Sequence, residues 1–90
     1  MIARQYLISG QVQGVGFRWF TQKLSRSTRM VGWVRNLPDG RVEAWAQTEE
    51  GDWPLWEAGL RQGPPGARVS EVAVFEVNPD EGLATFRIVD

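Results

Sequence analysis

The chain contains neither cysteine nor histidine. Without cysteine it has no disulfide bond, no thiolate nucleophile and no zinc-finger ligand. Without histidine it lacks the commonest general base and the commonest metal ligand of proteins, and every catalytic triad built on imidazole is excluded. Any chemistry that this chain performs must therefore use other groups.

Long apolar segments are also missing. No apolar run approaches the roughly 20 residues that a membrane-spanning helix needs, and residues 1–20 lack the basic-then-apolar order of a secretory signal peptide. We therefore expect a soluble cytoplasmic protein with no membrane partner. Linkers, repeats and low-complexity segments are absent as well, so residues 1–90 are expected to form a single domain, and at this size a monomer.

Acidic residues are scarce in the first half of the chain. Residues 1–42 hold seven basic residues and one acidic residue, whereas residues 43–90 hold three basic and ten acidic ones. The basic first half suits an anionic ligand, although attraction between elements that face each other explains the same asymmetry. The overall isoelectric point near 5.4 argues against broad binding to a phosphate backbone, so no nucleic-acid partner is expected.

The hydrophobic periodicity predicts five strands and two helices. The first helix begins at Phe17 and runs to about Met30, and the second follows Asp52, a suitable cap, and ends by Gly63. The predicted strands cover residues 3–9, 31–36, 41–48, 71–77 and, as a short last strand, 84–89.

This order is β-α-β-β-α-β with a short extra strand, which predicts an α+β, ferredoxin-like α/β sandwich: an antiparallel sheet covered on one face by two helices. Many unrelated activities use this fold. One alternative is a binding module, either a small-molecule sensor or an RNA-binding sheet. An RNA reader needs aromatic side chains on the central strands of the open face, and Phe17 and Phe20 are expected on the helix side.

The stretch Gly10–Arg18 contains three glycines and no acidic residue. Glycine permits positive φ angles and close approach of a ligand to backbone N–H groups. A helix that begins at Phe17 directs its free N–H groups and the positive end of its dipole into this loop. Arg18 can reach back and bind the same anion with two parallel hydrogen bonds. These features predict an anion-binding loop, although a simple tight turn also explains the glycines, and the spacing matches neither a P-loop nor a dinucleotide fingerprint.

Two separated motifs resemble signatures of the acylphosphatase family. Gly10–Arg18 (GQVQGVGFR) closely resembles its phosphate-binding loop, and Gly32–Asn36 (GWVRN) followed by Asp39–Glu43 (DGRVE) resembles its second signature. Weaker similarities occur at Gly63-Pro64 and at the closing Phe86–Ile88. The resemblance spans essentially the whole chain.

The resemblance implies a hydrolase that cleaves the carboxyl–phosphate bond of acyl phosphates by direct attack of an oriented water, giving a carboxylate and inorganic phosphate. The implied catalytic residues are Arg18, which binds the phosphoryl oxygens, and Asn36, which orients the water. On residue type alone, Asn36 is more simply a turn former. Neither a metal nor a cofactor is implied, and the physiological acyl group stays open. The implied phosphate-binding residues are Gln13, Gly14, Val15, Gly16, Phe17 and Arg18.

Two further questions follow from the resemblance. The family usually ends its first helix with a left-handed glycine, where this chain has Arg29. A non-glycine residue in that conformation costs about 1–2 kcal/mol, unless the helix ends by another route. A regulatory or carbamoyl-processing version of the domain, as found fused to larger maturation proteins, is the alternative within the family.

Overall fold

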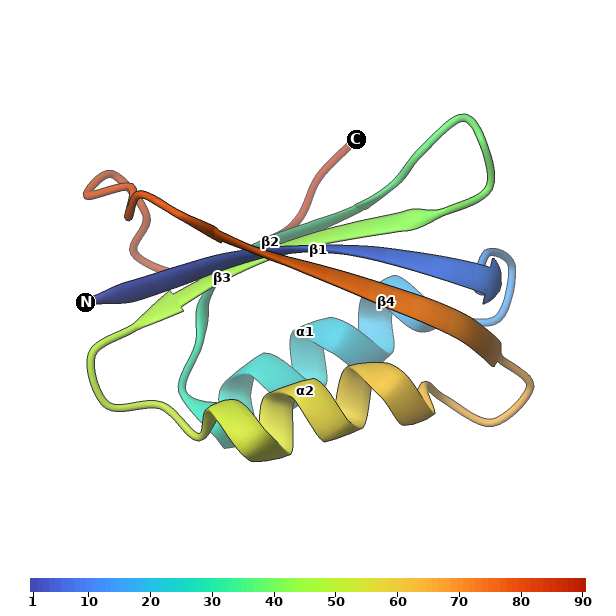
Figure 1. The fold of residues 1–90 in the computed structure, drawn as a ribbon, viewed down its shortest axis with the longest axis horizontal. Coiled ribbons are helices and arrows are strands. Elements are labelled where there is room, and N and C mark those ends of the chain that lie inside the picture. Colours follow the sequence, from blue (N-terminus) through green and yellow to red (C-terminus); the bar gives the residue numbers. More distant parts are fainter.

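The structure, a computed structural model, describes all 90 residues and has the predicted ferredoxin-like α+β fold. Its five-stranded sheet has the order β4-β1-β3-β2-β5, and both helices lie side by side on one face of it (Figure 1). Neither helix has the length and apolar character needed to cross a lipid bilayer. The elements in chain order are β1 (Ile2–Gln11), α1 (Phe17–Thr28), β2 (Val31–Asn36), β3 (Val42–Thr48), α2 (Trp53–Gln62), β4 (Arg68–Val77) and β5 (Phe86–Ile88).

The sheet is the predicted antiparallel one for strands β4, β1, β3 and β2, with one addition. β5 pairs in parallel with β2, and this register places Ile88 beside Val34. The sheet is therefore mixed at one edge. Periodicity within a strand says nothing about the direction of its partner, so this pairing could not be predicted from the sequence.

β4 begins at Arg68, earlier than the predicted residue 71, because it continues to pair with β1 beyond a register shift between Ser9 and Gly10. Gly10 has a φ of 126°, and a Cβ placed on it would lie 2.0 Å from the carbonyl oxygen of Arg68. Only glycine permits so close an approach of the two backbones. The first glycine of the loop thus has a role in the sheet.

The core lies between the sheet and the helices. The side chains that alternate toward the helices are buried, among them Tyr6 and Ile8, whereas Leu7 faces the other side. Trp56 of α2 fills the centre, with edge-to-face contacts to Tyr6 at 6.1 Å and to Phe86 at 5.6 Å between ring centroids. Large aromatic surfaces therefore close a core that a chain of this length would otherwise fill poorly.

The buried face of α1 is apolar only in part. Phe17 is buried, but Phe20 and Leu24 are only half-buried. The remaining buried positions carry hydroxyl groups, which donate hydrogen bonds to helix carbonyls one turn back and thereby satisfy their polarity. These positions are Thr21, Ser25 and Thr28.

The second helix forms as predicted, and its interior glycine has a packing role. Asp52 caps the helix by accepting a hydrogen bond from the N–H of Leu55 at 3.0 Å. A Cβ on Gly59 would lie 2.5 Å from a methyl group of Leu24 on α1. The glycine thus leaves room for that side chain where the two helices meet, which compensates for its low helix propensity.

Arg29 ends α1 in the left-handed conformation, with φ 60° and ψ 44°, and its backbone N–H donates to the carbonyl of Ser25. We therefore expect Arg29→Gly to raise the stability of the protein by about 1 kcal/mol, because glycine removes the left-handed strain. For a domain of this size, that change raises Tm by about 4–8 °C in a thermal melt.

Arg26→Gly is the matched control for this prediction. Arg26 is also exposed and lies in the last turn of the same helix, so the control removes the same charge. It places glycine within the helix and should lower stability by about 1 kcal/mol. An unchanged or lower Tm in Arg29→Gly would contradict the prediction.

Candidate active site

Three connections meet at one end of the molecule: the β1–α1 loop, the β2–β3 turn and the α2–β4 loop (Figure 1). The β1–α1 loop is anchored in the core by Val12 and Phe17, whose exposed fractions are 1% and 2%. Between these anchors, Gly14 and Gly16 are exposed, with left-handed φ angles of 76° and 77°. The sequence therefore holds both ends of the loop and leaves its backbone open to solvent and to a ligand.

The loop leads directly into the N-terminus of α1. Gly16 is the N-cap, no side chain caps the helix, and its first turn contains no acidic residue. The N–H of Phe20 makes the first intrahelical bond, to the carbonyl of Gly16 at 3.0 Å. The N–H groups that precede it have no acceptor within the helix, and they carry the positive end of the dipole. An anion would satisfy them.

A hollow of about 230 Å³ lies at this helix end and brings Arg18 and Asn36 together. Arg18 is exposed and Asn36 is half-buried. Unlike the arginines of β1, β2 and the β2–β3 turn, Arg18 forms no ion pair with a carboxylate. No acidic residue lines the hollow, so its charge is positive. The lining residues are Val12, Gly14, Gly16, Phe17, Arg18, Trp19, Asn36 and Ile88.

The lining matches the sequence prediction in part. Among the predicted phosphate-binding residues, Gly14, Gly16, Phe17 and Arg18 line the hollow, whereas Gln13 and Val15 do not. Three lining residues were not predicted: Val12, Trp19 and Ile88. Trp19 directly follows Arg18 and is an exposed aromatic residue, which sequence reasoning could have noticed. Ile88 reaches the hollow only because β5 pairs with β2, and no local signal predicts that pairing.

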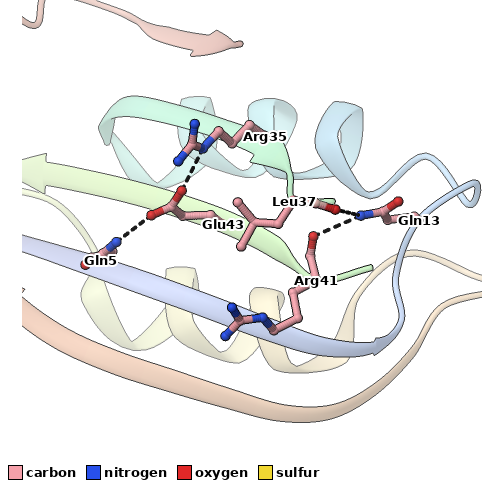
Figure 2. Close-up of polar contacts among 6 residues, drawn as sticks. All are labelled: Gln5, Gln13, Arg35, Leu37, Arg41 and Glu43. Atoms are coloured by element: carbon pink, nitrogen blue, oxygen red, sulfur yellow. Dashed lines mark hydrogen bonds and ion pairs between the residues drawn. The ribbon is translucent and has the colours of Figure 1, made fainter. Parts of the chain in front are cut away.

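Gln13 has a second role that its sequence position did not reveal. Its side-chain amide donates to the carbonyl of Leu37 at 2.8 Å and to the carbonyl of Arg41 at 3.0 Å, as Figure 2 shows. These bonds tie the β1–α1 loop to the β2–β3 turn, immediately after Asn36. The side chain of Gln13 therefore sets the position of the arginine-bearing loop relative to the asparagine.

A second polar cluster, on the open face of the sheet, joins strands β1, β3 and β2. The carboxylate of Glu43 is buried on β3 and accepts hydrogen bonds from the side-chain amide of Gln5 on β1 and from Nε of Arg35 on β2, the latter at 2.7 Å (Figure 2). Because Arg35 is partly solvated, this pair contributes little free energy. It fixes the end of β2 just before Asn36.

Asp39 is bonded within the β2–β3 turn. Its carboxylate accepts hydrogen bonds from the backbone N–H of Arg41 at 3.1 Å and from the Nε of the same residue at 2.8 Å. These bonds, first of all the one from the backbone, lower the pKa of Asp39 below its usual value. A carboxylate with a lowered pKa is a weaker proton acceptor.

The open face of the sheet bears on the RNA-binding alternative. Trp45 on the central strand β3 lies directly opposite Trp33 on β2, and both are half-buried on this face. Aromatic side chains are therefore present where an RNA reader needs them, although Phe17 and Phe20 are not among them. The guanidinium of Arg35 already lies over the Trp33 ring, 5.6 Å from its centroid. The hollow beside that ring is lined by three residues, whereas eight residues line the hollow at the helix end.

Fold and hollow together define a class: a small α+β domain in which a glycine loop, a helix N-terminus, an arginine and an asparagine line one hollow. The sequence model of the acylphosphatase family matches residues 4–88, and the chain belongs to this family. It is 48% identical over 87 residues to the acylphosphatase of Acaryochloris marina, covering 97% of this chain and 89% of that protein.

Solved structures agree with this assignment. The crystal structure of acylphosphatase from Bacillus subtilis matches with a TM-score of 0.93 at 36% identity, and the match covers 100% of both chains. The crystal structure of Thermococcus kodakarensis HypF matches with a TM-score of 0.76 at 28% identity, and there the match covers 100% of this chain but only 12% of HypF. The chain is thus similar to a complete acylphosphatase and to one part of a larger protein, and its function is that of an acylphosphatase.

Proposed function

We propose that Arg18 and Asn36 catalyse hydrolysis of the carboxyl–phosphate bond of small acyl phosphates in the hollow at the N-terminus of α1. The observation that carries the proposal is that this one hollow joins both side chains to a capless helix end. The phosphoryl group lies in the loop, and its oxygens accept hydrogen bonds from the backbone N–H groups of residues 13–17 and from the guanidinium of Arg18.

These groups suit the transition state of phosphoryl transfer. That state is loose, with negative charge spread over the equatorial oxygens, so the protein contributes mainly positioning and charge stabilisation. Donors already fixed by the loop and the helix need no reorganisation during the reaction, and each such donor is worth about 100- to 1,000-fold in rate.

Asn36 orients the attacking water through its side-chain amide. An amide does not accept a proton at neutral pH, so the proton goes elsewhere. The water oxygen forms a bond to phosphorus, the bond from phosphorus to the acyl oxygen breaks, and the carboxylate leaves with the electron pair. The water proton passes to an oxygen of the phosphoryl group, which gives inorganic phosphate. A carboxylate is a good leaving group, so the reaction needs no protein acid.

Hydrolysis of benzoyl phosphate, followed optically in the presence of EDTA, tests this function. We expect rapid turnover that EDTA does not change. The structure gathers no group of three or more His, Cys, Asp and Glu side chains that could hold a metal ion, and independence of metals is a prediction that the chelator checks. Absence of turnover by the folded protein would refute the proposed function and leave the hollow as a binding site for an anion.

Truncation of the side chain of Gln13 provides a further test of the site. We expect Gln13→Ala to lower kcat by about 10-fold and to leave the Kd for inorganic phosphate within about 2-fold. The variant keeps the backbone N–H groups of the loop but loses the two bonds to the β2–β3 turn, so Asn36 is less well placed relative to the phosphate.

The control for Gln13 is Gln11→Ala, which truncates an exposed glutamine two positions earlier and should change neither quantity. Phosphate affinity is measured by competitive inhibition. A 10-fold loss of phosphate affinity in Gln13→Ala would show instead that this side chain contacts the anion.

We also propose that the protein acts as a monomer in the cytoplasm. The residues of the proposed site all come from one chain, which supports activity without a second subunit. The proposed substrates are charged phosphorylated metabolites, and burying such charges in a bilayer is costly, so an enzyme that consumes them is expected in the compartment where they form.

A further inference from the structure

A second hollow adjoins the phosphate site. It is a groove of about 650 Å³ between the outer side of α1 and the loop that follows α2. The groove and the phosphate site share two residues, Gly16 and Trp19, so they are continuous at the first turn of the helix. The family signatures contain neither Trp19 nor the rest of the helix surface that forms the groove.

The lining of the groove is predominantly apolar. Lys23 and Ser27 are its polar side chains. The ammonium group of Lys23 lies over the ring of Trp19, 4.6 Å from the centroid, so it already has a partner. Trp19 itself is 62% exposed even with Lys23 over its ring, so much of this large apolar side chain is open to solvent. The apolar lining consists of Val15, Trp19, Phe20, Leu24, Pro64 and Pro65.

The direction of the reaction points into this groove. In phosphoryl transfer, the attacking and leaving oxygens lie roughly in line on opposite sides of phosphorus. Asn36, which orients the water, lines the phosphate hollow and not the groove. The acyl group must therefore leave the hollow on a side away from Asn36, and the groove opens from the hollow at Gly16 and Trp19.

We propose that this groove is the acyl subsite of the enzyme and that it takes apolar acyl groups, aliphatic or aromatic, against the ring of Trp19. This inference rests on the proposed function, because it assigns a place to the part of the substrate that the phosphate loop does not recognise. It makes the acyl phosphates of apolar carboxylic acids the favoured substrate class.

The test compares unbranched acyl phosphates from acetyl to hexanoyl phosphate. Their leaving carboxylates have nearly the same basicity, so differences in kcat/KM report contacts with the chain. A fully buried methylene is worth about 4-fold. Because the groove is open on one side, we expect about 1.8-fold per methylene, which over the four added methylenes makes kcat/KM about 10-fold higher for hexanoyl than for acetyl phosphate.

Two variants separate the groove from general effects on the protein. In Trp19→Ala, kcat/KM for hexanoyl phosphate should be less than about 3-fold higher than kcat/KM for acetyl phosphate. Phe75→Ala is the matched control, since Phe75 is an aromatic residue 47% exposed on β4, outside the groove, and it should leave the ratio at about 10-fold. A ratio near 1 in the unmodified protein, or one unchanged in Trp19→Ala, would overturn the acyl subsite.

Non-hydrolysable ligands keep this test independent of the proposed function. In methylphosphonate and hexylphosphonate, an alkyl carbon bonded to phosphorus takes the position of the leaving acyl oxygen. Their binding is measured by calorimetry. Hexylphosphonate has five more methylenes than methylphosphonate, so we expect it to bind about 20-fold more tightly, and this preference should fall in Trp19→Ala. If no acyl phosphate is hydrolysed, the proposed function fails, but this affinity ratio still shows whether the groove binds an apolar chain. If acetyl phosphate is hydrolysed and both ratios are near 1, the groove fails alone.

Discussion

Arg18→Ala is expected to lower kcat/KM for benzoyl phosphate by about 100-fold or more while the protein stays folded. The variant loses a charged, two-pronged donor to the phosphoryl oxygens, and loss of one such donor typically costs about 100- to 1,000-fold. Stability should change little, with Tm within about 2 °C of the unmodified protein, because Arg18 is exposed and forms no ion pair. Steady-state kinetics and a thermal melt measure the two effects.

Two further variants make the result specific to Arg18. Arg26→Ala removes the same charge from an exposed position on the same helix, and we expect its kcat/KM to stay within about 2-fold. Arg18→Lys keeps the charge but loses the planar pair of donors, so it should recover only part of the activity. Near-normal activity in a folded Arg18→Ala protein would remove the central claim about this site.

Asn36→Ala is expected to lower kcat by about 100-fold or more with little change in KM. The phosphate is bound by the loop and by Arg18, so substrate affinity should survive, whereas the water loses the amide that orients it. A change confined to kcat marks an interaction that acts in the transition state. The measurement is the kcat and KM of benzoyl phosphate hydrolysis, with Kd for inorganic phosphate as an independent measure of binding.

Asn78→Ala is the matched control for Asn36. Asn78 is an exposed asparagine directly after strand β4, whereas Asn36 is the last residue of β2, so both lie at a strand end. Truncation of Asn78 therefore reports any general effect of removing such an amide. It should leave kcat unchanged. An Asn36→Ala protein whose KM rises while its kcat is retained would make Asn36 a binding residue and would require another group to place the water.

Much of the site could be predicted because its parts are local in sequence. Val12 and Phe17 anchor a loop whose glycines have left-handed φ angles. The helix begins where the spacing of apolar residues changes from the alternation of a strand to the period of a helix. Such features depend on residues a few positions apart. The side chains around Asn36 were harder to predict. The bonds from Gln13 to the β2–β3 turn join residues 24 and 28 positions apart, so a glutamine that organises the site looks like any other polar loop residue.

The first helix shows the same limit within one element. It begins at Phe17 as predicted and ends at Thr28, two residues before the predicted Met30, and its inward side carries Thr21 and Ser25 as well as Phe17. Hydroxyl groups satisfied by the helix's own carbonyls can be buried almost as readily as small apolar groups. Which side faces the sheet is decided by packing against α2 and β2, and the hydrophobic pattern alone gives only an approximate direction.

The sequence by itself determined the order of the elements, the caps and turns that separate them, and the two motifs that carry Arg18 and Asn36, because each depends on the conformational preferences of neighbouring residues. The tertiary structure alone decided the parallel pairing of β5, which brings Ile88 to the phosphate site. It also decided the approach of Pro64 and Pro65 to α1, which forms the apolar groove. These contacts join residues far apart in the chain, and their geometry exists only once the sheet has twisted and the helices have packed on it.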